Sequence, residues 1–126
     1  MSKPIFVFGS NLAGRHGKGA ALFARQNHGA IYGQGRGPQG TSYAIPTKFG
    51  NLRTMPLRMI TEYVAIFLHF AHTHPEMTFQ LTPIGCGLAG YKPKDIAPMF
   101  RDAPENVLLP AEFLDVIQAQ GPRHAD

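Results

Sequence analysis

Two glycine-rich segments, each placed after a segment with a strand pattern, constrain this 126-residue chain more than any other feature. The first, Gly9–Gly19, follows the run Ile5–Phe8, and the second, Gly85–Gly90, comes shortly after the segment Met77–Leu81. The continuous apolar run Ile5–Phe8 is typical of a buried strand, and Met77–Leu81 alternates between apolar and polar residues, which is also typical of a strand. Glycine-rich turns between a strand and a helix are typical of α/β proteins, which bind ligands beyond the carboxyl ends of their strands. We therefore expect any functional site to lie beside these two segments.

The rest of the chain alternates between strand and helix patterns. Strands are predicted over Ile5–Phe8, Thr41–Ile45, Met77–Leu81 and Val107–Leu109, and helices over Gly19–Asn27, Pro56–Thr73, Lys94–Arg101 and Pro110–Gln118. This order predicts an α/β fold of three layers, with a largely parallel or mixed sheet flanked by helices. The glycine-rich stretch Gly29–Gly40 is expected to be mostly loop. It contains a Gly-x-Gly-x-x-Gly pattern at Gly35–Gly40, but this leads into a strand instead of opening a helix, so it does not predict a dinucleotide site.

The length fits one domain over residues 1–120, with a flexible tail over 121–126. Hydrophobic residues make up 44% of the chain and charged residues 16%, a balance that excludes a disordered protein. Cys86 is the single cysteine, so no internal disulfide can form and a reducing, cytoplasmic setting is expected. No apolar run is long enough to cross a bilayer, so no membrane partner is predicted.

Charge is distributed unevenly along the chain. Residues 1–61 carry eight lysines and arginines and no acid, whereas all eight acids lie in residues 62–126. One interpretation is a solvated basic face that serves solubility. The other is a surface for an anionic partner, such as a nucleotide or a nucleic acid.

The first glycine segment has the composition of a phosphate-binding loop. Gly17, Lys18, Gly19 and Ala20 stand at the start of a predicted helix, where backbone N–H groups and the helix dipole favour an anion. Arg15, His16 and Lys18 add cationic side chains, although a tight turn would also require glycines. The segment is not a P-loop, because no Gly-Lys-Ser/Thr follows at the required spacing.

The second segment offers a matching loop, Gly85-Cys86-Gly87-Leu88-Ala89-Gly90-Tyr91. Its glycines can wrap a diphosphate from the other side, and Tyr91 is placed to cover a ribose or a base. Cys86 has no partner base in the sequence, so packing is the more economical role for it. Two such loops in one small sheet indicate a binding site more strongly than one.

Two further groups of side chains suggest chemistry. Lys48 follows a predicted strand and the rigid Pro46; it is either an ordinary solvated lysine or an amine nucleophile held in a pocket. His69, His72 and His74 lie close together, but no cysteine or carboxylate converges on them in the sequence. We predict neither a metal site nor a cofactor.

Together these motifs resemble the macrodomains, and most of all the branch that contains the DarG antitoxins and the terminal ADP-ribose protein glycohydrolases. The similarity rests on three motifs in the same order across residues 5–101: Ser10-Asn11-Leu12-Ala13-Gly14-Arg15-His16-Gly17-Lys18-Gly19-Ala20-Ala21, Ile45-Pro46-Thr47-Lys48 and Ile84-Gly85-Cys86-Gly87-Leu88. The resemblance implies binding of ADP-ribose, with its diphosphate between the two glycine loops. It also implies that Lys48 attacks the anomeric carbon of the distal ribose and that Asn11 contacts this ribose.

Two departures refine this expectation. Residues 1–61 lack the acid that reads adenine in macrodomains, so a related nucleotide is an alternative ligand. Ala89 stands where the protein glycohydrolases have an aspartate, and the DNA-directed members also lack that acid. The leading hypothesis is an ADP-ribosyl hydrolase acting on modified DNA or protein. A non-catalytic nucleotide-binding module is the main alternative, and a nucleic-acid-binding protein is the third.

Overall fold

The computed structural model describes residues 3–121, so the predicted tail beyond Gly121 lies outside the described residues. The strands are β1 (Ile5–Asn11), β2 (Gly37–Gln39), β3 (Ser42–Lys48), β4 (Phe79–Leu81) and β5 (Val107–Leu108). The helices are α1 (Gly19–Asn27), α2 (Leu57–His72), α3 (Pro93–Ile96) and α4 (Ala111–Ala119), with a short 3₁₀ helix η1 (Ala97–Phe100) after α3.

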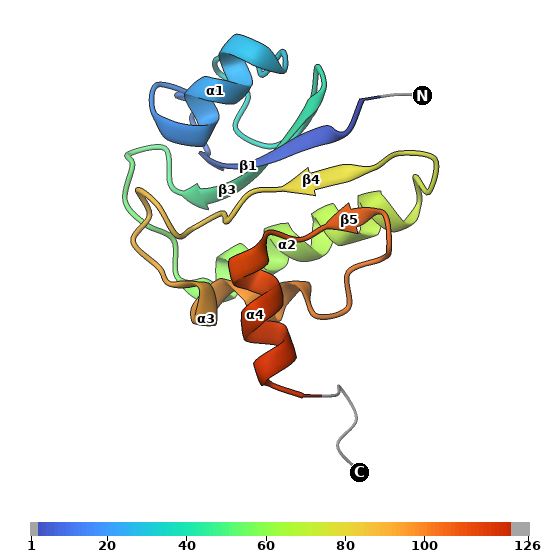
Figure 1. Cartoon of the computed structure of the whole chain (residues 1–126). Helices are drawn as coiled ribbons and strands as arrows, with labels where there is room; N and C mark the ends of the chain where they lie inside the picture. Colours follow the sequence, from blue (N-terminus) through green and yellow to red (C-terminus); the bar gives the residue numbers. More distant parts are fainter. Residues whose placement is uncertain (1–2, 122–126) are drawn as a thin grey trace.

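The five strands form one mixed sheet in the order β2-β3-β1-β4-β5. Strands β3, β1, β4 and β5 run parallel, and β2 pairs with β3 in the antiparallel sense. Helix α1 covers one face of the sheet, while α2, α3, η1 and α4 lie on the other (Figure 1). The predicted three-layer α/β fold is thus confirmed. No helix within residues 3–121 has the length and apolar character needed to cross a membrane.

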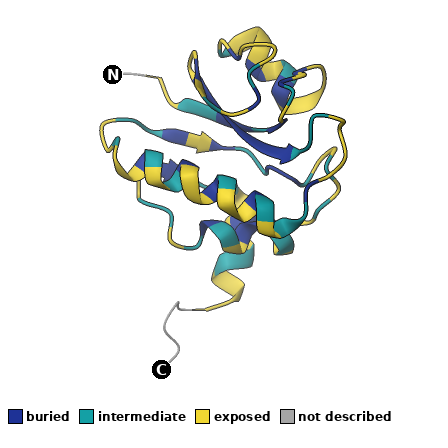
Figure 2. Cartoon of the chain, turned by 180° about the vertical axis from the view of Figure 1, so that it is seen from behind, coloured by how far each residue is buried: buried dark blue, intermediate teal, exposed yellow. Residues whose placement is uncertain are grey.

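The apolar core is divided unequally between the two faces of the sheet. On the α2 side, the helix buries a stripe of Ile60, Val64, Phe67 and Ala71 against a large cluster that extends to η1 and α4. On the α1 side, the buried cluster contains only Phe8 and four alanines, Ala21, Ala24, Ala30 and Ala44. Figure 2 shows the resulting pattern, with α2 alternating between buried and exposed positions along its length.

Two strands are longer than the sequence pattern predicted. β1 continues to Asn11, and β3 continues through Pro46 to Lys48, although a proline usually ends pairing because it lacks a backbone N–H. The antiparallel partner β2 pairs only as far as Ala44, and the register with β1 shifts just after Ser10, opposite Pro46. Pro46 therefore lies where one edge of β3 is unpaired and its ladder with β1 is irregular. As a result of the two extensions, the predicted site residues Asn11 and Lys48 fall within strands.

The segment expected to be loop contains the short strand β2. Its sequence, Gly37-Pro38-Gln39, has no apolar alternation, and it forms at the sheet edge, where Pro38 is tolerated. The helix predicted over Lys94–Arg101 is divided into α3 and η1. Pro98 explains the division, because it cannot donate the hydrogen bond that would continue an α-helix.

Candidate functional site

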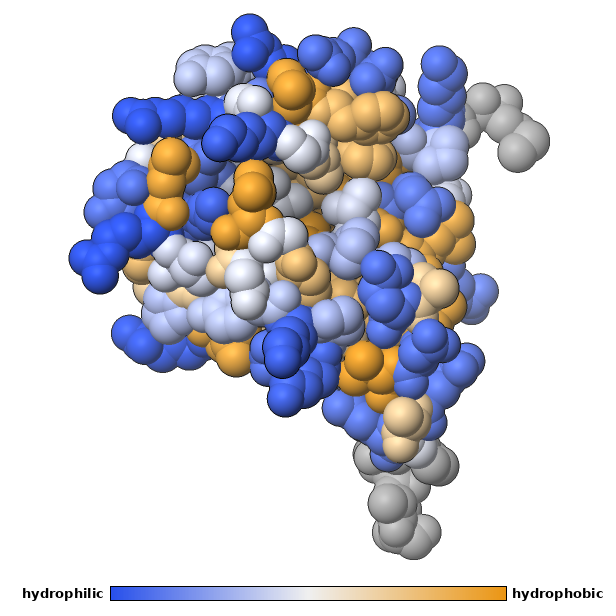
Figure 3. Space-filling model, turned by 60° about the vertical axis from the view of Figure 1, so that its left-hand side comes forward, coloured by the Kyte–Doolittle hydropathy of each residue, from blue (hydrophilic) through white to orange (hydrophobic). Residues whose placement is uncertain are grey.

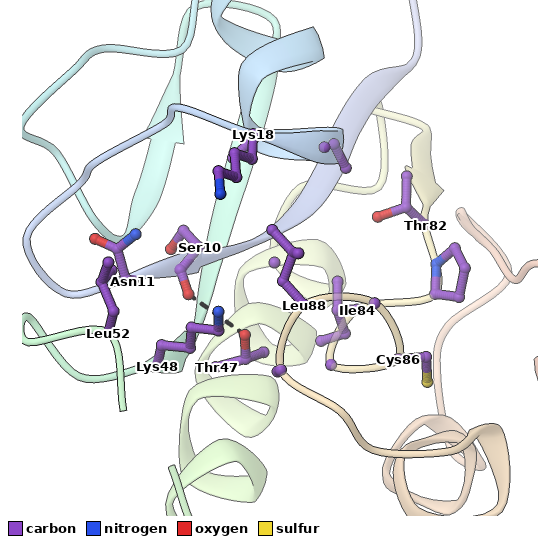
Figure 4. Close-up of a pocket in the computed structure, with 18 of the residues that line it drawn as sticks. Ser10, Asn11, Lys18, Thr47, Lys48, Leu52, Thr82, Ile84, Cys86 and Leu88 are labelled. Atoms are coloured by element: carbon purple, nitrogen blue, oxygen red, sulfur yellow. Dashed lines mark hydrogen bonds between the residues drawn. The ribbon is translucent and has the colours of Figure 1, made fainter. Parts of the chain in front are cut away.

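A cleft of about 690 Å³ opens at the carboxyl ends of the parallel strands, between the two glycine loops. It is lined by eleven of the predicted site residues: Asn11, Gly17, Lys18, Gly19, Ala20, Lys48, Gly85, Cys86, Gly87, Leu88 and Ala89. Figure 4 shows Lys18 descending from the start of α1, and Lys48 extending from β3 toward the same space. The size is within the range of sites that hold nucleotide-sized ligands.

Gly90 and Tyr91 do not line this cleft, which corrects the expectation that Tyr91 covers a ribose or a base. The Tyr91 hydroxyl instead donates a hydrogen bond of 2.6 Å to the Met55 carbonyl oxygen, and its ring packs against the main core. Gly90 has a φ of +89° and bonds back to Gly87, so it turns the chain toward α3. Both residues therefore hold the conformation of the second loop without facing the cleft.

The first loop is ordered by the side chain of Asn11. The Asn11 Nδ2 atom donates to the Arg15 carbonyl oxygen (3.1 Å), and Asn11 Oδ1 accepts from the Arg15 N–H (3.0 Å). These two bonds close the turn between β1 and α1. Asn11 therefore has a structural role in addition to the ligand contact that the family resemblance implies.

His16, for which the resemblance implies no role, lies wholly buried beneath the same loop. Its Nε2 atom lies 3.0 Å from the Gln34 carbonyl oxygen and 3.2 Å from Gln39 Oε1. Both partners are acceptors, because Gln39 Oε1 also accepts from the Ile31 N–H and thereby fixes the orientation of the Gln39 amide. Nε2 therefore carries the proton, and the imidazole ties the loop to the segment before β2.

Backbone contacts complete this support. A Cβ atom added to Gly35 would lie 2.6 Å from the Leu12 carbonyl oxygen and closer still to that of Asn11. The Ser10 hydroxyl also donates to the Gly35 carbonyl oxygen. Glycine is needed at Gly35 because two backbone segments touch there, whereas a Cβ at Gly17 would meet nothing within 4 Å. Gly35 is therefore a packing position, whereas Gly17 is open to the cleft.

Helix α1 begins at the cleft without a capping side chain. Its N-cap residue is Lys18, which makes no side-chain cap bond, and its first turn holds no acid. Within the described part of the chain, the N–H groups of Gly19 and Ala20 have no acceptor. Helix starts normally satisfy such groups with Ser, Thr, Asp or Asn, so this end is left open to a bound anion.

The second loop presents a similar set of donors. Gly85 has a φ of +76°, and a Cβ added to it would lie 3.0 Å from the Cδ1 atom of Ile96 in α3, so the loop lies close to this helix. The N–H groups of Gly87, Leu88 and Ala89 have no acceptor within residues 3–121. Successive free amides in a tight loop form a concave donor surface for an anion. The cleft is thus bordered by free amides on two sides.

Charged side chains around the cleft are predominantly basic. Arg15, Lys18 and Lys48 line it, and Glu112 is the one acid among its described lining residues. Lys48 is half buried, and its Nζ atom has no hydrogen-bond or ion-pair partner within residues 3–121. Figure 3, which brings the loop side forward, shows strongly hydrophilic side chains along this face with isolated apolar groups among them.

Sequence reasoning missed several residues of the cleft, and Leu52 and Glu112 are two of them. Leu52 adopts a φ of +70°, which is uncommon for a side chain of its size, and it is 45% exposed at the rim. Glu112 comes from α4, far from both loops in the sequence. No motif marks either position, because each reaches the cleft only through the tertiary fold.

The Cys86 thiol is held in its protonated form. Burial raises its pKa to about 11, and the carboxylates of Asp95 and Glu112 add to the shift. A thiol with this pKa is a poor nucleophile at neutral pH, which agrees with a packing role.

Alkylation of Cys86 should therefore be slow near pH 8 and should accelerate as the pH rises toward 11. At pH 8, we expect iodoacetamide to modify the folded protein roughly tenfold more slowly than the chain unfolded in urea. Glu112→Gln should speed the reaction of the folded protein, because it removes one negative charge. Equal rates in the folded and unfolded states would contradict the raised pKa.

The histidine group does not form a metal centre in the described residues. The His74 Nδ1 atom lies 2.7 Å from the Phe70 carbonyl oxygen, and its ring stacks on Phe70 at 4.0 Å. Within residues 3–121, no group of three or more His, Cys, Asp or Glu side chains is arranged to hold a metal ion.

Comparisons with known proteins add information on the fold alone. No protein-family model matches the chain, and no curated protein matches it either. One solved structure, a protein of unknown function from Bacteroides thetaiotaomicron, is similar with a TM-score of 0.56 and 16% sequence identity over 82% of each chain. At this identity the likeness supports the architecture and carries no information about activity.

Proposed function

We propose that the cleft binds ADP-ribose or a closely related nucleotide, and that Lys48 cleaves an ADP-ribosyl bond. The observation that carries the proposal is the pair of unsatisfied donor sets, Gly19 and Ala20 on one side and Gly87 to Ala89 on the other, that line one cleft. A diphosphate has acceptor oxygens on two adjacent phosphorus atoms, so it can engage both sets at once.

The charge and size of the cleft support the same ligand. Arg15 and Lys18 lie beside the first donor set and favour a dianion. The volume of about 690 Å³ exceeds what a diphosphate alone would fill, which leaves room for sugars on either side. Leu88, 66% exposed beside the second donor set, offers an apolar surface for a ribose or a base.

The proposed reaction uses the amine of Lys48. Its unprotonated nitrogen attacks the anomeric carbon, the glycosidic bond breaks, and the leaving group departs with the bonding electron pair. The new nitrogen–carbon linkage loses a proton to solvent, and the ribose ring opens to give an imine between the lysine and the sugar. Addition of water to this imine releases the sugar and restores the amine. Ala89 provides no acid, so the leaving group must be good or take a proton from elsewhere. A nucleobase anion is a far better leaving group than a serine alkoxide, so base-linked ADP-ribose on DNA suits the cleft better than a serine ether on protein.

Calorimetry with ADP-ribose, ADP and NAD tests the binding step. We expect Gly87→Val to weaken ADP-ribose binding more than tenfold, because a Cβ at Gly87 meets nothing within 4 Å and the new side chain would extend into open space of the cleft. Ala65→Val, at an exposed position on α2, is the matched control and should leave the affinity unchanged.

Thermal unfolding of both variants separates a local effect from misfolding. A folded Gly87→Val protein with wild-type affinity for ADP-ribose would show that the two loops do not form the nucleotide-binding site. If wild-type protein binds no nucleotide but binds DNA with a steep salt dependence, the nucleic-acid alternative is favoured instead.

A further inference from the structure

A second cavity of about 350 Å³ lies between the β2–β3 edge of the sheet and α2. It has no lining residue in common with the cleft, although β3 contributes to both. Its walls are mainly rings: Tyr63 and Phe70 from α2, Tyr43 and Pro46 from β3, and Pro38 from β2. Such a lining favours a flat apolar group that packs between rings.

The polar groups of this cavity favour an anion. Tyr43 is only 4% exposed, yet its hydroxyl has no hydrogen-bond partner within residues 3–121. Tyr43 is held by ring contacts with Phe67 (4.9 Å) and Phe70 (5.3 Å), so the hydroxyl is fixed in position. Among the described residues, His16 Nδ1 is the fully buried polar side-chain atom without a partner, and the Tyr43 oxygen is not one of these, so the hydroxyl reaches the cavity surface and can donate to a ligand acceptor.

Arg36 supplies a cationic group at the same place. It lines the cavity, and its charge acts on Tyr43: burial raises the pKa of the Tyr43 hydroxyl, and Arg36 lowers it. His69 lines the cavity as well, and none of the described lining residues is an acid. A guanidinium with a neighbouring hydroxyl donor matches a carboxylate, which accepts bonds on two oxygens.

We infer that this second cavity binds a small aromatic carboxylate, independently of the proposed function of the cleft. The aromatic ring packs among Tyr63, Phe70 and the prolines. The carboxylate pairs with Arg36 and accepts a hydrogen bond from the Tyr43 hydroxyl. The described lining residues include one guanidinium and no helix start. They therefore favour a monoanion over a phosphate.

Chemical-shift titration with three probes tests this site. We expect 3-phenylpropionate to bind about tenfold more tightly than 3-phenylpropionamide, which lacks the charge, and than propionate, which lacks the ring. Arg36→Gln and Tyr43→Phe should each weaken binding of 3-phenylpropionate about fivefold or more. Arg58→Gln, an exposed position on α2 outside the cavity, is the matched control and should have no effect.

Three outcomes would overturn the inference. These are equal affinity for the acid and the amide, wild-type affinity in both cavity variants, or displacement of 3-phenylpropionate by ADP-ribose with shifts confined to the cleft. Tyr43→Phe retains the buried ring, so thermal unfolding of this variant shows whether lost binding reflects the hydroxyl alone. Failure of the cleft to bind nucleotides would not affect this result, since the two sites have no lining residue in common.

Discussion

Replacing Lys48 with alanine is expected to abolish release of ADP-ribose from modified DNA, with a loss in rate of about a thousandfold or more. The affinity for ADP-ribose itself should stay within several-fold of wild type. The reason is that the donor sets assigned to the diphosphate belong to the backbone of the two loops, whereas Lys48 lies at the end of β3. The measurement is a single-turnover release assay, with calorimetry on the same variant.

Lys18→Ala is the matched control for this experiment. Lys18 lies at the start of α1, so its removal should weaken binding while release continues at saturating substrate. Borohydride should trap the sugar on Lys48 in wild-type protein and in Lys18→Ala. Wild-type protein that binds ADP-ribose, releases none from modified DNA or protein and traps no adduct would identify a non-catalytic binding module.

A large loss of stability is expected from Gly35→Ala. The added Cβ would meet the carbonyl oxygens of Leu12 and Asn11, which are backbone atoms at the base of the first loop. The φ of Gly35 lies outside the left-handed region, so the effect is steric. We expect the free energy of unfolding to fall by about 3 kcal/mol and the Tm to fall by roughly 10 °C.

Gly17→Ala is the control, since its Cβ would meet nothing within 4 Å and its φ is also outside the left-handed region. Its free energy of unfolding should change by less than about 0.5 kcal/mol. Denaturant unfolding of both variants is the measurement. Similar stabilities for the two alanine variants would show that the segment around Gly35 does not support the loop as the structure indicates.

Local signals in the sequence were sufficient for the main elements of the fold. Helix α1 has the predicted bounds, since helical spacing of small apolar residues coincides with glycines at both ends. Helix α2 also lies within the predicted range Pro56–Thr73, where Pro56 and Pro75 mark the two ends. The ends of β1 and β3 were not predictable in this way, because their extension depends on pairing between them and on the free edge beside Pro46.

The candidate site was predictable to the extent that it consists of backbone. Glycine positions and strand ends indicate where loops lie, and eleven predicted residues line the cleft. Side chains that act through the tertiary fold were not predictable. Tyr91 was misassigned because the direction of its ring depends on a bond to Met55, and His16 had no assigned role because its partners lie 18 and 23 residues away.

The unequal cores on the two faces of the sheet have a consequence for how the cleft opens and closes. Helix α1 is secured by Phe8 and small alanine side chains, whereas the opposite wall rests on the large cluster beneath α3. Segments with few buried apolar contacts open at a lower free-energy cost than the rest of a protein, so amide hydrogens in α1 should exchange with solvent before those in α2. A ligand that contacts both walls of the cleft must also hold the α1 wall, which opens at the lower free-energy cost, in place. The affinity of the cleft therefore depends on the packing of four alanine side chains as well as on the groups that touch the ligand.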